Sequence, residues 1–253
     1  MLRARTEIAW AIAVKCRAPQ DQLHVRWLPH PDAPELVDGL HPGEIACWLA
    51  AVSPDQNGAA VGPEVLGLER AAAILNFHEI NRLSRFLHHD DRRSYLAAHA
   101  GARLLLGNIV DRPPDSLRFL PSTNGKPMLV GISREIDFSL SHARGTVAVA
   151  AAAAPVGIDV EPLREIEHLA SMSELVLAAE EQAILWKAPG ALRSRLFLRY
   201  WTLKEALLKA AALGFTIPPN TLIVDAGPTP AVLSAPPELG SITQWRLIAS
   251  ASA

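Results

Sequence analysis

Proline and glycine divide this chain into short segments, and this division limits the folds open to it. The 253 residues include 20 Pro and 15 Gly, and these residues gather in loop-like stretches at 27–43, 53–63 and 226–240. The longest apolar run, Val147–Ile158, contains Pro155 and is far shorter than the roughly 20 residues that span a bilayer. The pattern predicts many short strands and helices, and no membrane span.

Charge and cysteine content exclude several classes of protein. Lys plus Arg number 24 and Asp plus Glu 26, a formal charge of −2, which argues against a nucleic-acid binder. The two cysteines, Cys16 and Cys47, are too few for a disulfide framework and indicate a reducing compartment. The apolar stretch Ile8–Val14 has no convincing cleavage site and ends at Lys15, so no signal peptide is expected. A cytoplasmic protein is predicted.

The spacing of apolar residues predicts both strands and helices. Strands are expected at Glu44–Val52, Leu117–Leu120, Met128–Val130, Phe138–Leu140, Val156–Val160, Leu222–Val224 and Trp245–Ala249. Helices are expected at Glu64–Phe86, Arg92–Leu106, 163–188 and Leu192–Leu213. Thr146–Ala152 is open between strand and helix. Because several strand pairs are joined by short turns, the pattern favours an α+β fold over a continuous βαβ array.

Two segments place polar residues at strand ends. Asn124-Gly125-Lys126-Pro127 predicts a hairpin turn, and the residues alone favour a surface turn with a solvated lysine. Phe138-Ser139-Leu140-Ser141-His142 places a serine beside a histidine without a nucleophile elbow. Anion binding by the Ser141 hydroxyl, the imidazole and the amides of the following turn is one interpretation. A strand end with a satisfied histidine is the other.

Gly157-Ile158-Asp159-Val160-Glu161 places two carboxylates two residues apart on a predicted strand. Side chains at this spacing project from the same face. Two adjacent carboxylates repel each other unless a cation relieves them, and hard oxygen ligands suit Mg²⁺. The alternative is a solvated polar face on a half-exposed strand.

The segment Trp201–Lys209 is predicted to be helical, with Trp201, Glu205 and Leu208 on one stripe. A carboxylate on such a stripe needs a partner, either a metal or Lys209 one turn further on. A simple intrahelical pair of Glu205 with Lys209 is the alternative.

Together and in this order, the four segments resemble the motifs of the Sfp-type 4′-phosphopantetheinyl transferases. The matching residues are 125–127, 139–142, 157–161 and 201–209. Segments 82–86 and 91–96 are also similar to helices of the family's first half, and the resemblance covers roughly 44–249.

The resemblance implies a fold of two similar, pseudo-twofold-related α+β subdomains with coenzyme A in the cleft between them. The expected divisions are an atypical N-terminal extension at 1–43, an N-terminal half at 44–152 and a C-terminal half at 153–253. The last strand of the family's final hairpin is expected to be either absent or supplied by residues 1–43. An internal pseudo-dimer makes a monomer sufficient.

The resemblance also implies transfer of phosphopantetheine from coenzyme A to a carrier-protein serine, with release of adenosine 3′,5′-bisphosphate. Asp159 and Glu205, with Glu161 as a third ligand, would hold Mg²⁺ on the pyrophosphate. Lys209 would neutralise the pyrophosphate, and Glu205 is hypothesised to accept the serine proton, directly or through a metal-bound water. Residues on the coenzyme A side would be Arg82, Lys126, Pro127, Ser141 and His142.

The sequence departs from the family pattern at Ser139, Ala143 and Ala212, the last replacing a glycine after the motif helix. All expected charged positions are filled, which favours an active transferase for polyketide, nonribosomal-peptide or fatty-acid carrier proteins. The alternatives are a non-catalytic module that binds coenzyme A or a carrier protein, and a Mg²⁺-dependent phosphohydrolase. Carrier partners of the family are usually acidic, and candidate residues to face one are Arg82, Arg85, Arg92, Arg93 and Arg103.

Overall fold

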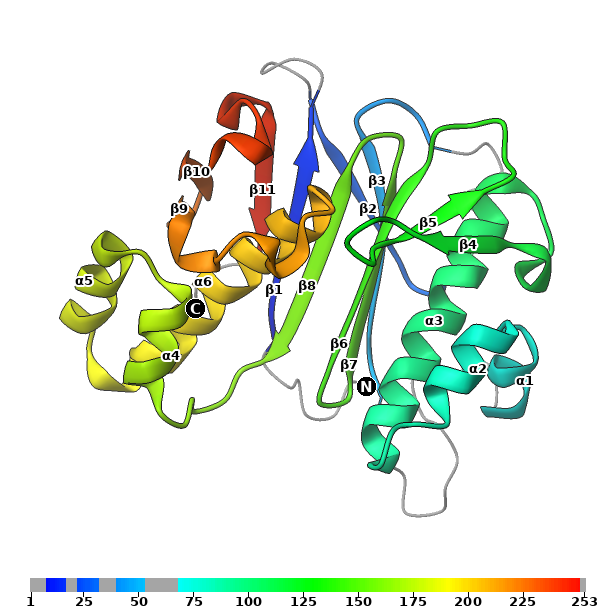
Figure 1. Ribbon diagram of the computed structural model, residues 1–253, viewed down its shortest axis with the longest axis horizontal. Helices are drawn as coiled ribbons and strands as arrows, with labels where there is room; N and C mark the ends of the chain where they lie inside the picture. Colours follow the sequence, from blue (N-terminus) through cyan, green and yellow to red (C-terminus); the bar gives the residue numbers. More distant parts are fainter. Residues whose placement is uncertain (1–7, 17–21, 32–39, 53–67, 251–253) are drawn as a thin grey trace. The chain divides into compact units, whose positions relative to one another are not determined.

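The computed structural model describes residues 8–16, 22–31, 40–52 and 68–250, and it combines helices with several sheets (Figure 1). The chain forms two compact units. Of the described residues, unit 1 contains 8–16, 122–126 and 155–250, and unit 2 contains 22–31, 40–52, 68–121 and 127–154. The predicted α+β class is confirmed.

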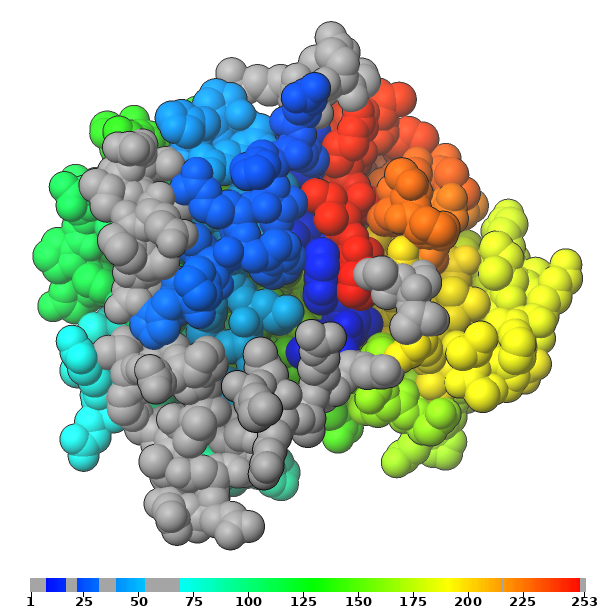
Figure 2. Space-filling view, turned by 180° about the vertical axis from the view of Figure 1, so that it is seen from behind, coloured from blue at the N-terminus to red at the C-terminus, as the bar shows by residue number. Residues whose placement is uncertain are grey.

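Unit 1 is built on an antiparallel three-stranded sheet in the order β11-β1-β8. The strands are β1 (Ile8–Lys15), β8 (Val156–Pro162) and β11 (Trp245–Ala249), and a separate hairpin joins β9 (Ile223–Asp225) to β10 (Ala231–Ser234). The helices are α4 (Leu169–Val176), α5 (Ala179–Lys187) and α6 (Gly190–Ala210), with short 3₁₀ turns at Gly214–Thr216, Pro219–Thr221, Pro237–Leu239 and Ile242–Gln244. Figure 2 shows β1, in blue, beside β11, in red.

Small residues let α6 lie directly against this sheet. Ala9, Ala11 and Ala13 alternate along β1 and belong to the same buried core as Leu203 and Leu207 of α6. Alternate residues of a strand share one face, so this face of β1 carries only the small methyl side chains of alanine. The helix therefore packs closely on both β1 and β8.

Unit 2 is built on a four-stranded sheet in the order β2-β3-β7-β6. The strands are β2 (His24–Leu28), β3 (Glu44–Ala51), β6 (Asp137–Ala143) and β7 (Thr146–Ala152), and a separate hairpin joins β4 (Arg118–Pro121) to β5 (Pro127–Val130). The helices are α1 (Leu68–Ala73), α2 (Phe77–Leu83) and α3 (His89–Val110), followed by a 3₁₀ turn at Pro114–Ser116. Helix α3 packs on β6 and β7. Gly101 permits the close approach, because a Cβ there would stand 2.3 Å from the Trp48 ring.

Long-range pairing decides the segments that the sequence left open. Thr146–Ala152 is a strand, because it pairs with β3 on one side and β6 on the other and is buried throughout. Residues 1–43, which gave no clear pattern, contain β1 and β2. Since β1 pairs with β11, a strand from the first 43 residues does lie beside the strand at Trp245–Ala249.

Capping interactions correct the helix boundaries. In the described part of Glu64–Phe86 there are two helices, because Asn76 and Glu79 exchange hydrogen bonds of 2.9 Å in a capping box that begins α2. The segment 163–188 likewise divides into α4 and α5. Helix α3 continues past the expected end at Leu106 to Val110, and its C-cap residue Asp111 has a left-handed backbone conformation.

The domain boundaries expected at 43/44 and 152/153 stay a prediction. The compact units described here instead divide at 21/22 and 154/155, with residues 122–126 grouped in unit 1. None of the helices in the described residues is long and apolar enough to cross a membrane.

Candidate active site

Strand β8 brings the two carboxylates of the Gly157–Glu161 segment to α6. In the register with β1, Gly157 lies opposite Ala13, Asp159 opposite Ala11 and Glu161 opposite Ala9. A Cβ at Gly157 would stand 2.0 Å from the carbonyl oxygen of Ala206 and 2.5 Å from the amide nitrogen of Ala210. Glycine is therefore needed here for β8 to approach the helix backbone.

Helix α6 supplies Glu205 and Lys209 to the same place. Lys209 Nζ lies 2.7 Å from Asp159 Oδ1 and 3.4 Å from the Ile158 carbonyl oxygen. Asp159 is only 5% exposed, so the interpretation of a solvated polar strand face is wrong for this residue. Lys209 therefore pairs with a carboxylate on β8. The alternative considered from the sequence was a pair with Glu205 within the helix.

Glu205 is a buried carboxylate in an unfavourable electrostatic setting. Burial, and then the negative charge of Asp159, raise its pKa to about 7; Lys209 opposes this shift and Glu161 adds to it. Among the described residues, Glu205 Oε1 has no hydrogen-bond partner. A buried acceptor of this kind carries a desolvation cost that a bound cation would relieve.

The carboxylates of Asp159 and Glu205 have the chemistry that suits a divalent cation. No group of three or more His, Cys, Asp or Glu side chains suited to a metal occurs in the described part of the chain. Glu161 is half-buried and its Oε2 lies 4.0 Å from Arg164 NH2. Mg²⁺ is commonly held by one or two carboxylates together with substrate phosphates, so Asp159 and Glu205 fit that chemistry.

The turn between β4 and β5 contributes Asn124 and Lys126 to unit 1. The predicted hairpin is confirmed, with Gly125 at a positive φ of 86°. Lys126 Nζ donates to the Val156 carbonyl at 2.9 Å, and the Asn124 side-chain amide donates to the Ala212 carbonyl at 3.0 Å. Lys126 thus contacts the start of β8. Pro127 begins β5 and pairs with Pro121.

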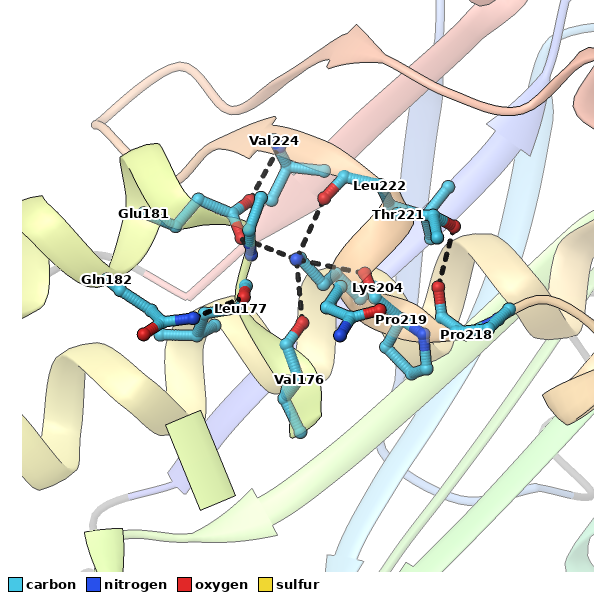
Figure 3. A network of polar contacts seen from close by, with 12 residues as sticks. Val176, Leu177, Glu181, Gln182, Lys204, Pro218, Pro219, Thr221, Leu222 and Val224 are labelled. Atoms are coloured by element: carbon cyan, nitrogen blue, oxygen red, sulfur yellow. Dashed lines mark hydrogen bonds and ion pairs between the residues drawn. The ribbon is translucent and has the colours of Figure 1, made fainter. Parts of the chain in front are cut away.

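Lys204, next to Glu205 in the helix, organises a network that the sequence analysis missed (Figure 3). Its side chain is 0% exposed and its Nζ lies 2.5 Å from Glu181 Oε2. It also donates to the carbonyl oxygens of Val176, Pro219 and Leu222 at 2.8, 3.0 and 2.9 Å. Burial lowers the pKa of Lys204, and the charge and hydrogen bond of Glu181 oppose that shift. The signal was a lysine inside an apolar helical segment, which must find a buried partner.

Glu181 completes this network from the other side. Its carboxylate accepts hydrogen bonds from the backbone amides of Ala178 and Val224, both at 2.8 Å. The Lys204–Glu181 pair therefore joins α6 to the start of α5, the end of α4 and the segment before β9.

Of the residues expected on the coenzyme A side, Lys126 belongs to unit 1, and Arg82, Pro127, Ser141 and His142 belong to unit 2. Ser141 and His142 are on β6, opposite Ala148 and Val147 of β7, and Arg82 is exposed in the last turn of α2. The hairpin after His142 is tight, with positive φ at Arg144 (45°) and Gly145 (81°). The Gly145 amide donates to Ser94 Oγ at 3.2 Å, so this turn amide is engaged within the protein.

Arg103 is not a surface residue available to a partner, and this corrects its inclusion among the candidate docking arginines. It is 0% exposed. Its Nε lies 2.9 Å from Glu79 Oε2, and its NH1 donates to the carbonyls of Pro114 and Leu117 at 2.8 and 3.1 Å. Position 103 falls on the face of α3 that is turned inward, which a list of arginines along the sequence does not reveal.

Comparisons with known proteins agree on one family. Residues 155–248 match the 4′-phosphopantetheinyl transferase superfamily, and residues 62–154 match a family described as 4′-phosphopantetheinyl transferase, N-terminal. The 4′-phosphopantetheinyl transferase HetI of Nostoc is 30% identical over 191 residues, which is 74% of this chain and 75% of the relative. A putative 4′-phosphopantetheinyl transferase of Synechocystis is 29% identical, covering 69% of this chain and 71% of the relative. The Sfp transferase of Bacillus subtilis is 22% identical, covering 62% and 68%.

Proposed function

Because this chain belongs to the 4′-phosphopantetheinyl transferases, we propose that it transfers the phosphopantetheine arm of coenzyme A to a serine hydroxyl of an acyl or peptidyl carrier protein, in the manner of the Sfp type. The serine oxygen forms a bond to the β-phosphorus of coenzyme A. The bond from that phosphorus to the bridging pyrophosphate oxygen breaks. Adenosine 3′,5′-bisphosphate leaves, and the serine proton passes to a base.

The observation that carries this proposal is the buried pair Asp159 and Glu205. One oxygen of Glu205 has no partner within the described chain, and its pKa is raised to about 7 by burial and by Asp159. We assign Mg²⁺ to these two carboxylates, with Glu161 as the third candidate ligand. When bound, the ion would neutralise charge on the pyrophosphate. Coenzyme A is the substrate that supplies the remaining oxygen ligands.

Lys209 and Glu205 act directly on the reacting groups in this proposal. Lys209, held 2.7 Å from Asp159, presents positive charge where the pyrophosphate gains negative charge. Glu205 is the carboxylate proposed to accept the serine proton.

Ser141 and His142 are proposed to contact the 3′-phosphate end of coenzyme A. Arg82 and Lys126 are proposed to add phosphate or adenine-side contacts, and Pro127 a further contact on the same substrate. An imidazole, a hydroxyl and a guanidinium are donors suited to phosphate. Lys126 already donates to the Val156 carbonyl, so its expected effect is the smallest of the charged residues.

The carrier protein is proposed to be acidic around its serine, because exposed arginines lie on and after α2. These are Arg82, Arg85 and Arg92, with Arg93 half-buried. Within the described residues, Cys16 and Cys47 form no disulfide, which suits a reducing, cytoplasmic compartment. A monomer carrying both units is part of the same proposal.

The test is the intact mass of a carrier domain after incubation with this protein, coenzyme A and Mg²⁺. We expect a gain equal to one phosphopantetheine, abolished by EDTA and reduced by about a hundredfold or more in rate by Glu205→Gln. Glu238→Gln, which changes an exposed carboxylate of the same unit, is the matched control and should keep full activity.

Each alternative function predicts a different result in this assay. Coenzyme A binding without a mass gain on any of several carriers would favour a non-catalytic binding module. Release of phosphate or nucleotide without a carrier would favour a phosphohydrolase. Full turnover of Glu205→Gln at saturating Mg²⁺ would remove Glu205 from the role of base.

A further inference from the structure

Two aromatic rings hold the imidazole of His142. The ring of Tyr95 meets it edge-on, with centroids 5.9 Å apart and planes at 82°. Phe86 meets it in the same manner at 6.5 Å and 74°. The two aromatic rings also pack on each other at 5.1 Å. The imidazole, on a strand of the sheet, is thus oriented by rings from the start of α3 and from the segment before it.

The ring of Tyr95 is itself held in place by His99. It is buried, and its ring stacks on His99 with centroids 4.0 Å apart. His99 Nδ1 lies 3.0 Å from Glu79 Oε1, and the other oxygen of Glu79 accepts from Arg103 and from the Asn76 amide. Although burial opposes ionisation of Glu79, hydrogen bonds from His99, Asn76 and Arg103 and the charge of Arg103 hold its pKa below its ordinary value. The ring of Tyr95 therefore cannot move without disturbing a buried, charged network.

The helix that carries Tyr95 is also tied to the hairpin that carries His142. Ser94 Oγ accepts from the Gly145 amide at 3.2 Å and donates to the Asp90 carbonyl at 2.9 Å. This bond joins the start of α3 to the turn that follows β6. The distance between the Tyr95 ring and His142 is thus set by the backbone as well as by packing.

The charge of Arg82 also acts on this tyrosine. Burial and the charge of Glu79 raise the pKa of Tyr95 to about 12, and Arg82 opposes the shift. Tyr95 thus contacts His142, a residue assigned to the phosphate, and also feels the charge of Arg82.

We propose that Tyr95 and Phe86 are positioning residues that hold His142 in the orientation that contacts the 3′-phosphate of coenzyme A. The inference rests on the proposed function, because it takes the phosphate contact of His142 from there. The two rings remove rotamer freedom from the imidazole before the substrate arrives, so less entropy is lost on binding. They act through His142 and do not themselves bind the phosphate.

The test compares the dissociation constants of coenzyme A and 3′-dephospho-coenzyme A by titration calorimetry, which needs no turnover. The wild-type protein should prefer coenzyme A, and His142→Ala should reduce that preference by about tenfold or more, as expected for a lost hydrogen bond to a charged group. Tyr95→Leu and Phe86→Leu should reduce the preference to a similar extent while leaving the affinity for the dephospho compound unchanged.

Two control variants separate positioning from other roles. Phe77→Leu removes an exposed ring of the same unit whose aromatic neighbour is His78, and it should keep the preference. Tyr95→Phe keeps the ring and should also keep it. If Tyr95→Phe loses as much as Tyr95→Leu, the hydroxyl contacts the phosphate and the positioning role is wrong. Because Phe86 is only half-buried, Phe86→Leu decides the matter even if Tyr95→Leu does not fold.

Failure of this inference is distinguishable from failure of the proposed function. A loss of preference in His142→Ala without a loss in Tyr95→Leu or Phe86→Leu overturns the positioning role alone. An unchanged preference in His142→Ala overturns the phosphate contact, and the positioning role with it. The carrier mass assay reports on transfer independently of both results.

Discussion

At the scale of single residues, Ala212 occupies a backbone conformation that glycine would adopt more easily. It follows the end of α6 with a φ of 54°, and the Leu213 amide donates back to the Leu208 carbonyl at 3.1 Å. This is the helix ending at which glycine is usual, because a Cβ in the left-handed region costs about 1 kcal/mol. We therefore predict that Ala212→Gly raises the free energy of unfolding by roughly 0.5–1 kcal/mol in urea titrations. A lower stability would mean that the methyl group makes a compensating contact.

The raised pKa of Glu205 leads, also at the residue scale, to a prediction of how the free energy of unfolding depends on pH. Its pKa in the folded protein is about 7, against an ordinary 4.5, so the folded state binds more protons than the unfolded chain between these values. The free energy of unfolding should then fall as the pH rises from about 4.5 to about 7, by at most about 3 kcal/mol, and stay lower above that range. Asp159, Glu161 and Lys209 are the charged groups that act on it.

The measurement is urea unfolding in EDTA at about pH 5 and about pH 8. Glu205→Gln, which cannot ionise, should lose this part of the pH dependence and be more stable than the wild type at the higher pH. A variant with the wild-type slope would show that another group causes it.

At the scale of elements, α6 is anchored by a buried cation rather than by apolar packing alone. Removing one partner of a buried ion pair typically costs about 3–5 kcal/mol, because the other charge is left uncompensated. We predict a loss of this order for Lys204→Met, since Glu181 and three carbonyl groups would lose their donor. Lys187→Met, at an exposed lysine of α5, is the control and should change the thermal midpoint little. Equal midpoints for the two variants would contradict the anchoring role.

At the scale of the whole molecule, the sheet of unit 1 depends on a strand that comes from the start of the chain. Ala13 of β1 is fully buried between Gly157 of β8 and Leu247 of β11 in the register of the sheet. Ala13→Asp places an unpaired carboxylate in this core. We predict that hydrogen exchange of the β8 and β11 amides then accelerates, while the amides of β6 and β7 keep more of their protection as an internal reference. Unchanged protection of β8 would show that β1 is dispensable to the sheet.

Much of the local structure could be predicted from the sequence. The strand at Glu44–Ala51, the turn at Asn124-Gly125 and the long helix carrying Glu205 follow from patterns a few residues long. The sequence did not predict that two expected helices are each divided in two. In the helix expected at Glu64–Phe86, the apolar spacing runs on past Asn76 and masks the capping box that Asn76 forms with Glu79.

The order and spacing of the motifs in the sequence identified the family and made Asp159 and Glu205 the candidates for its chemistry. Only the tertiary structure decided their surroundings. It makes β1 the middle strand of the sheet, pairs Lys209 with Asp159 and turns Arg103 inward onto Glu79. The physical reason is that helix and turn patterns depend on neighbours in the chain, whereas strand pairing, burial and ion pairing depend on residues that folding brings together from far apart.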